Sequence, residues 1–381
     1  MIKYCINCLF PSTKPDLLFN NDGVCNACTN YWNRPEINWE SRSQEFKKIV
    51  KSIKSTNYWD CVIPVSGGKD STYQALIAKE NGLNPLLVNS RTCDLSGIGR
   101  RNLDNLRGLG FDLIEVLPNP KVRSKLNLIG LQEVGDISWP EHIGMFTIPF
   151  TIALKFDIPV ILYGENAQHE YGGPEHLVNN NFQDRRWLEE IGGTLGLRLE
   201  DVLLASGFNE KDLAIYKFPD SKDLQNKNIK AYYLGYFFQW NGLSNYIVSQ
   251  AHGMESFGKP VEGSLVDYEN LDNHQNGIHE YLKILKHGYG RITDQASILI
   301  RRGLITREEG LYFVKKNEVK FPWTYLGKRI EKIIEPLGIG IDELIEIFDS
   351  FTNKKIFKIN KDGSIFKDKD GNVVKLNYEN G

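Results

Sequence analysis

The chain has no long apolar run and almost no net charge. Its 381 residues include 46 Lys and Arg against 48 Asp and Glu, which gives a formal net charge of −2. No apolar segment approaches the roughly 18 to 20 residues that cross a bilayer, so we expect no membrane partner. A chain this close to neutrality also argues against a nucleic acid as the main partner, because phosphate neutralisation needs a basic face.

The N-terminus lacks the pattern of a secretory signal, because the opening MIKYCINCLF reaches a polar, Cys-paired segment at once. We therefore expect a cytoplasmic protein. Six cysteines in such a chain indicate metal binding or catalysis rather than disulfides. The composition, with 41% apolar and 25% charged residues, is typical of a globular protein with one large domain and appendages, or with two domains.

Four of the cysteines form two C-x-x-C pairs near the N-terminus. Cys5 and Cys8 make the first pair, Cys25 and Cys28 make the second, and sixteen residues separate the pairs. This is the spacing of a four-thiolate zinc site, in which each pair grips the metal from one tight turn. We predict a structural Zn2+ in a module at 1–40, because four protein ligands leave no open position for substrate. The alternatives are an iron–sulfur cluster, two disulfides or free thiols.

The chain lacks the Gly-x-x-x-x-Gly-Lys-Ser/Thr pattern of the usual P-loop, but a different glycine turn follows an apolar segment. Residues 61–65 (CVIPV) predict a buried strand, and SGGKDS then leads into a helix expected from Thr72 to Lys79. A strand, a Gly-rich turn and a helix N-terminus together bind anions, because the backbone approaches closely and the first helical N–H groups are unpaired. We predict a di- or triphosphate site made by Ser66, Gly67, Gly68, Lys69, Asp70 and Ser71. The alternative is a Gly-rich turn that binds no ligand.

Strand and helix patterns alternate after this turn. Further strands are expected at 84–89, 111–117 and 158–163, and helices at 98–108, 121–133 and 143–156. The alternation predicts an α/β fold with a doubly wound parallel sheet, in a core at 41–260 that includes an insert at 174–230. Residues 261–381 predict a mainly helical C-terminal region that ends in a β-hairpin. The aromatic segment 232–240 is interpreted as core or as the contact of a homo-oligomer.

Ligands of a parallel sheet bind at the carboxyl ends of its strands. The glycine turn should therefore meet Val88 and Asn89 at the end of the second strand. It should also meet the polar segment after the fourth strand, which contains Gly164, Glu165, Asn166, His169, Glu170 and Tyr171. Glu165 is a candidate Mg2+ ligand. His142 lies in a second polar loop, and each histidine has an ordinary structural role as its alternative.

The S-G-G-x-D-S turn after a strand resembles the PP-loop of the ATP pyrophosphatase superfamily, which includes GMP synthetase, NAD synthetase, asparagine synthetase and tRNA thiolases. The resemblance implies that ATP binds with Mg2+, is cut between its α and β phosphates and transfers AMP to a substrate oxygen. It further implies that Val88 and Asn89 hold adenine, and that Gly164 lies near the α-phosphate.

A wider set of motifs narrows the resemblance. The Cys pairs, V-S-G-G-K-D-S, W-P-E-H-I-G at 139–144, G-E-N-x-Q-H-E-Y-G-G at 164–173, E-G-S at 262–264 and H-G-Y-G-R-I-T-D at 287–294 together resemble bacterial N-acetyl sugar amidotransferases. These enzymes serve surface-polysaccharide and nonulosonic-acid pathways. The resemblance covers residues 1–320, although Val261 stands where the family commonly has Thr.

The amidotransferase resemblance implies a reaction and a set of roles. The acetamido oxygen of an N-acetyl sugar is adenylylated, ammonia displaces AMP, and an acetamidino group remains. The catalytic candidates are Lys69, Asp70, Glu165, Asn166 and His169. The candidates for sugar binding are His142, Glu170, Tyr171, Glu262, Gly263 and Arg291.

The chain has no recognisable glutaminase nucleophile, because Ile2 follows Met1, Cys61 lies in a strand and Cys93 lacks a Gly-x-Cys-x-Gly elbow. The ammonia is therefore free ammonium or comes from a separate subunit. The resemblance implies a glutaminase subunit and a cyclase-like barrel subunit as partners. Two other functions stay open: a tRNA thiolase that uses Cys93, and a non-catalytic subunit that only binds nucleotide.

Overall fold

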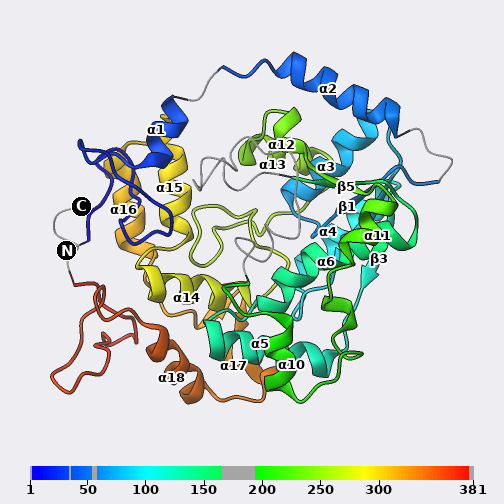
Figure 1. Cartoon of the computed structure of the whole chain (residues 1–381). Coiled ribbons are helices and arrows are strands. Elements are labelled where there is room, and N and C mark those ends of the chain that lie inside the picture. The colour runs from blue at the N-terminus through cyan, green and yellow to red at the C-terminus, as the bar shows by residue number, and fades with distance from the viewer. Residues whose placement is uncertain (1, 34–35, 54–57, 165–193, 377–381) are drawn as a thin grey trace.

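The computed structural model describes residues 2–33, 36–53, 58–164 and 194–376. A five-stranded parallel sheet with the order β3-β2-β1-β4-β5 lies on the right of the molecule in Figure 1. The strands are β1 (Cys61–Pro64), β2 (Pro85–Ser90), β3 (Asp112–Val116), β4 (Val160–Tyr163) and β5 (Lys230–Tyr233). The predicted doubly wound parallel sheet is confirmed.

Helices cover both faces of the sheet, which explains why its central strands are apolar throughout. Successive strand residues point to opposite faces. Ile63 packs with side chains of α2 (Trp39–Ser52), α3 (Lys69–Glu80), α4 (Gly97–Gly108) and α12 (Leu234–Phe237). Its neighbour Val62 packs on the other face with α6 (Trp139–Lys155). A strand buried on both faces has no polar side, and this produces continuous apolar runs.

Further helices complete the first part of the chain. They are α1 (Asn26–Trp32), α5 (Pro120–Val134), α10 (Leu199–Ser206), η1 (Ala214–Tyr216), α11 (Ser221–Asn226) and α13 (Gly242–Ala251). Among the described residues, no helix combines the length and the apolar character that a bilayer crossing requires.

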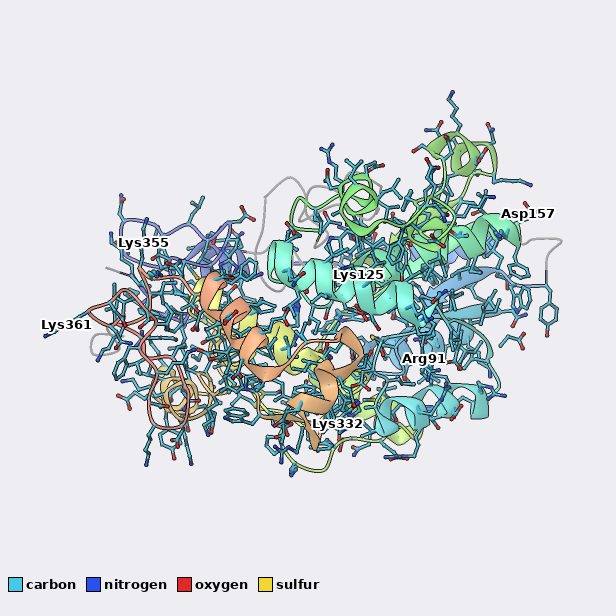
Figure 2. All side chains as sticks on the ribbon, turned by 90° about the horizontal axis from the view of Figure 1, so that it is seen from below. Arg91, Lys125, Asp157, Lys332, Lys355 and Lys361 are labelled. Atoms are coloured by element: carbon cyan, nitrogen blue, oxygen red, sulfur yellow. The ribbon has the colours of Figure 1, made fainter. Side chains whose placement is uncertain are left out.

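The predicted helical C-terminal region is also confirmed. It contains α14 (Asn276–His287), α15 (Arg291–Arg301), α16 (Arg307–Asn317), α17 (Ile330–Ile334), η2 (Glu335–Leu337) and α18 (Ile341–Phe351), with a small hairpin of β6 (Thr324–Tyr325) and β7 (Lys328–Arg329). The tail pairs through isolated antiparallel bridges, such as Phe357 with Lys375. Figure 2 shows Lys355 and Lys361 of this tail at the opposite end of the molecule from Asp157.

The N-terminal cysteine module packs against the C-terminal region rather than against the sheet. Leu9 shares an apolar cluster with Ile292, Ala296 and Val314. The Arg307 guanidinium donates from Nε to the carbonyl oxygen of Cys8 over 3.2 Å. Figure 1 accordingly shows α1 beside α15 and α16. The two ends of the described chain therefore build one side of the molecule together.

Candidate active site

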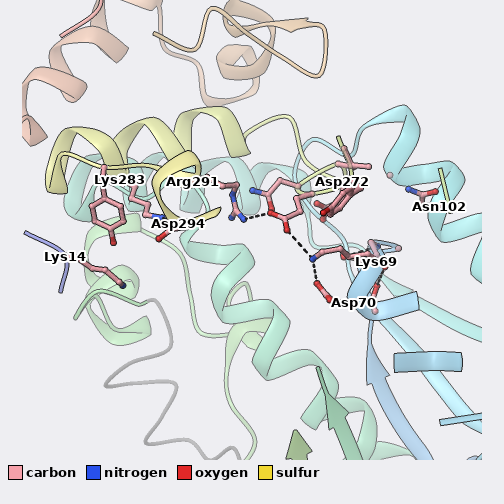
Figure 3. A pocket seen from close by; sticks show the side chains of 18 residues that line it. Lys14, Lys69, Asp70, Asn102, Asp272, Lys283, Arg291 and Asp294 are labelled. Atoms are coloured by element: carbon pink, nitrogen blue, oxygen red, sulfur yellow. Dashed lines mark hydrogen bonds and ion pairs between the residues drawn. The ribbon is translucent and has the colours of Figure 1, made fainter. Parts of the chain in front are cut away.

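A cavity of about 470 Å3 lies where the sheet region meets the C-terminal region (Figure 3). The glycine turn at 66–71 and the start of α4 form one wall. The segment 268–272 and residues of α14 and α15 form the other. Lys14 of the cysteine module also lines it. The cavity has the size of a small-molecule site, and three regions that are distant in sequence contribute to it.

The glycine turn has the backbone shape that anion binding requires. Gly67 has φ +84°, and a Cβ atom there would lie 2.9 Å from the backbone nitrogen of Leu103. Only glycine fits this conformation and this close approach. Gly68 then caps α3 with an extended backbone and no side-chain cap. The helix begins at Lys69 and not at Thr72 as predicted, so its first turn belongs to the cavity wall.

Lys69 connects the turn to the C-terminal region. Its Nζ atom lies 2.5 Å from Oδ2 of Asp70 and 3.4 Å from Oε1 of Glu269. Helix α13 supports this pair from behind, because Asn245 donates to Asp70 Oδ1 over 2.8 Å and Ser249 donates to the Lys69 carbonyl over 2.7 Å. The cation is thus held at the mouth of the glycine turn.

Charged side chains continue from Lys69 across the cavity. Arg291 pairs with Oε2 of Glu269 at 3.2 Å and with Oε1 of Glu280 at 2.9 Å. Burial acts to raise the pKa of Glu269, but the charges of Lys69 and Arg291 outweigh burial and hold that pKa below its usual value. The same opposition, with Arg291 as the main cation, lowers the pKa of Glu280 to about 2. Both carboxylates are therefore ionised near neutral pH.

A third carboxyl group behaves differently. Asp272 lines the cavity, and burial raises its pKa to about 6. Beyond Arg291, Lys283 forms an ion pair with Asp294, and both residues also line the cavity. Burial acts to lower the pKa of Lys283, but the charge of Asp294 outweighs it, so that the pKa is raised. Carboxylate oxygens are the ligands that Mg2+ prefers, so the cavity holds donors suited to a metal–nucleotide complex.

The structure places seven of the predicted site residues on the cavity wall, namely Ser66, Gly67, Gly68, Lys69, Asp70, Ser71 and Arg291. Val88 instead lies in the sheet core with 1% of its surface exposed. The amide of Asn89 donates to the carbonyl of Val65 over 2.7 Å. Gly164 lies against Gln74 and Trp240. The adenine-binding role of Val88 and Asn89 and the α-phosphate role of Gly164 stay predictions.

The other predicted sugar-binding residues lie apart from the cavity walls or outside the described chain. Glu262 accepts hydrogen bonds from the Thr324 hydroxyl at 3.2 Å and the Leu326 backbone at 3.1 Å, and Gly263 forms a turn with φ +73°. His142 bonds through Nδ1 to the buried Asp136 at 2.8 Å. Glu165, Asn166, His169, Glu170 and Tyr171 lie outside the described residues.

Several cavity residues were not found from the sequence. Tyr289 and Asp294 belong to the H-G-Y-G-R-I-T-D motif, from which only Arg291 was chosen. Glu269 and Lys14 lie in segments without any motif of their own. Selecting every charged residue of that motif would have found Asp294, whereas Lys14 carries no local signal.

The four N-terminal cysteines form a closed cluster with no exposed surface. The Sγ atoms of Cys5 and Cys28 are 3.9 Å apart, and those of Cys8 and Cys25 are 3.7 Å apart. A tetrahedral zinc site with bonds of about 2.3 Å has sulfur–sulfur distances of about 3.8 Å. The backbone N–H of Cys25 also donates to Cys5 Sγ over 3.3 Å, which suits a thiolate. The residues therefore fit a structural zinc ion.

Comparison with known proteins gives a partial match. Residues 254–369 match the family model described as "LPS biosynthesis protein WbpG-like, C-terminal domain". The C-terminal region is therefore similar to that of lipopolysaccharide biosynthesis proteins. The matched segment supplies one entire wall of the cavity, from Tyr268 to Asp294. No curated protein matches the chain.

Solved structures that resemble the chain include two synthetases. NMN synthetase from Francisella tularensis is 12% identical, with a TM-score of 0.27, and the match covers 51% of this chain and 92% of that one. The NH3-dependent NAD synthetase from Campylobacter jejuni, in complex with nitrate, is 10% identical, with a TM-score of 0.30 and coverage of 50% and 94%.

Proposed function

We propose that the chain is an ATP-dependent amidotransferase that converts the acetamido group of an N-acetyl sugar into an acetamidino group. One observation carries the proposal. The S-G-G-K-D-S turn, suited to the phosphates of ATP, shares a cavity with Glu269, Lys283 and Arg291 from the region that resembles lipopolysaccharide biosynthesis proteins. A phosphate site and a sugar-pathway region that face the same space suit a reaction between ATP and a sugar.

The first step is transfer of AMP to the sugar. The acetamido oxygen attacks the α-phosphorus, and the bond from phosphorus to the pyrophosphate oxygen breaks. The N–H groups of Gly67 and Gly68 and the ammonium of Lys69 stabilise the charge on the departing pyrophosphate. The Asp70 and Asp272 carboxylates are the candidate ligands that would hold Mg2+, which when bound would neutralise phosphate charge.

The second step replaces oxygen by nitrogen. Ammonia attacks the imidate carbon, the bond from that carbon to the oxygen of AMP breaks, and the nitrogen loses one proton. Adenylylation is needed because the oxygen of a free amide is a poor leaving group. In our proposal a glutaminase subunit with a cyclase-like barrel subunit supplies the ammonia, and the cysteine module holds zinc for structural reasons only.

The state of the cysteines supports this function over that of a tRNA thiolase. A thiolase needs a reactive thiolate near the site. Burial, with Glu141 as the next cause, raises the pKa of Cys93 to about 11, and Cys61 has no exposed surface in β1. The other four cysteines belong to the closed cluster. Both free thiols therefore favour the neutral form, which is the weaker nucleophile.

The test is turnover with defined sugars. The purified chain is mixed with ATP, Mg2+, ammonium and a panel of N-acetyl sugars, and pyrophosphate and AMP are measured. We expect both products in equal amounts, together with a sugar whose mass reflects the exchange of oxygen for NH. Lys69→Ala should lower the rate about 100- to 1000-fold, as loss of a transition-state donor does. Lys79→Ala, at the exposed end of the same helix, is the control.

Each competing function predicts a different outcome. Pyrophosphate release with tRNA and a sulfur donor, abolished by Cys93→Ala, would establish a thiolase. ATP binding with no pyrophosphate from any acceptor would establish a non-catalytic subunit. In an amidotransferase Cys93→Ala should leave the rate unchanged.

A further inference from the structure

One ammonium group in the cavity has neither an ion pair nor a side-chain hydrogen bond within the described part of the chain. Lys14 comes from the cysteine module, between the two Cys pairs, and it lines the cavity. Its Nζ atom lies 5.3 Å from the ring centre of Phe10 and 6.0 Å from that of Tyr289. Burial lowers the pKa of Lys14. A desolvated ammonium that faces two rings is a strong site for an incoming anion.

The other charges at this end of the cavity already have partners. Lys283 is paired with Asp294, and Arg291 is shared between Glu269 and Glu280. Lys283 and Asp294 cancel, and Arg291 already faces two carboxylates, so Lys14 adds an ammonium that no ion pair occupies within the described residues. Figure 3 shows Lys14 on the side of Lys283 and Asp294, with Lys69 on the other side of the cavity and Arg291 between them. The Lys14 ammonium is therefore remote from the phosphate-binding turn.

We propose that Lys14 binds the anionic group of the acceptor sugar, so that the cysteine module contributes directly to substrate recognition. This inference rests on the proposed function. The chemistry calls for an oxyanion, either the phosphate of a nucleotide-linked sugar or the carboxylate of an acidic sugar. ATP occupies the turn at 66–71, and the acceptor lies across the cavity with its anion on Lys14. Coordination of zinc by the four cysteines would fix the position of Lys14, because the residue lies between the two Cys pairs.

The experiment separates the acceptor from ATP by kinetics. Lys14→Met removes the charge, Lys14→Arg keeps it, and Lys3→Met alters an exposed lysine of the same module. UDP-N-acetylglucosamine probes the phosphate, N-acetylneuraminic acid probes the carboxylate, and N-acetylglucosamine is the neutral reference. The KM values for acceptor and for ATP are measured with each variant, and zinc content verifies that the module is folded.

We expect Lys14→Met to raise the KM for one charged acceptor about 10- to 100-fold, as loss of a charge-assisted hydrogen bond does. The KM for ATP and turnover of the neutral sugar should change by less than about twofold, and Lys14→Arg should restore most of the affinity. The acceptor that responds identifies the anion. An equal rise in the KM for ATP, or an unchanged KM for both charged acceptors, overturns the inference and leaves the proposed function standing.

A binding measurement keeps the inference testable if no acceptor is turned over. Calorimetric titration of the two charged sugars into the wild type and Lys14→Met needs no catalysis. Weaker binding to Lys14→Met without turnover would support the subsite and contradict the proposed reaction. Equal binding by both proteins, or no binding by either, would overturn the subsite.

Discussion

The Nζ atom of Lys69 lies 3.4 Å from Oε1 of Glu269, and this pair joins the glycine turn to the C-terminal region. Phosphates that enter the turn compete with Glu269 for the same ammonium. Glu269 keeps two other partners, Arg291 at 3.2 Å and the amide of Gln295 at 2.8 Å. Nucleotide binding therefore exchanges one anionic partner of Lys69 for another and does not leave a buried carboxylate unpaired.

Gly67→Ala should impair both folding and nucleotide binding. Its positive φ disfavours any other residue, and a Cβ atom would lie 2.9 Å from a backbone nitrogen of α4. Gly82→Ala is a matched control, because Gly82 has φ +83° and a Cβ atom there would meet nothing within 4 Å. We expect Gly82→Ala to cost about 1 kcal/mol of unfolding free energy and Gly67→Ala to cost more. Denaturant unfolding measures the free energy of unfolding, and titration measures the affinity for ATP. Equal values for Gly67→Ala and Gly82→Ala would contradict the claim that a Cβ atom at Gly67 is too close to α4.

Glu280→Gln should change how stability depends on pH. The pKa of Glu280 in the folded protein is about 2, below its usual 4.5. Such a group stabilises the fold fully above pH 4.5 and loses that contribution as pH falls toward 2. At about 1.4 kcal/mol per pKa unit, Glu280→Gln should cost roughly 3 kcal/mol at pH 7. Urea unfolding from pH 7 to 3.5 should show that the difference from the wild type shrinks as pH falls.

The control for Glu280 is Glu335→Gln. Glu335 pairs with Lys332 at 3.1 Å on an exposed surface, where ion pairs contribute little. This variant should match the wild type at every pH. A constant difference between Glu280→Gln and the wild type across the pH range would show that its charge does not contribute to stability.

Metal analysis should find one zinc per chain and no visible absorption from an iron–sulfur cluster. Cys25→Ser should lose the zinc, because it removes one of the four buried ligands. The same variant should have a lower unfolding temperature, because the module packs on α15. It should also have a lower rate of turnover, because the module contributes Lys14 to the cavity. Cys93→Ala is the control and should retain the metal. Full zinc content in Cys25→Ser would rule out the four-thiolate site.

Glutamine alone should not support turnover by the isolated chain. Cys61 is fully buried and the pKa of Cys93 is raised to about 11, so neither is suited to be a glutaminase nucleophile. We expect ammonium to replace glutamine, and glutamine to work only when a glutaminase subunit and its barrel partner are added. Initial rates of AMP formation with each nitrogen source measure this. Full glutamine-dependent activity of the chain alone would refute the prediction.

The sheet was predictable because strands that are buried on both faces are apolar throughout. Residues 61–64 and 85–88 are apolar on both faces, and each strand is followed by a helical pattern. The fifth strand was missed because Tyr232 and Tyr233 run directly into α12, which is also aromatic, so no change of pattern marks the boundary. The turn was found, but the start of α3 was placed too late, since Lys69 and Asp70 have the polarity of a loop.

Apart from the segment 287–294, whose motif gave Arg291, the far side of the cavity was not predictable from local patterns. Glu269 belongs to a segment without regular structure, and Lys14 lies in a connection between cysteine pairs. Their place in the site depends on how the C-terminal region packs against the glycine turn. Such long-range packing leaves no periodicity or spacing in the sequence.

The packing of the N-terminal cysteine module against helices α15 and α16 has a consequence for synthesis on the ribosome. The glycine turn leaves the exit tunnel well before Arg291 and Asp294 do, so a nascent chain carries half of its binding site for much of its elongation. A ribosome stalled before α15 would display that turn without the opposite wall. The complete cavity thus forms late in translation, after α15 has been synthesised and has packed against the N-terminal module.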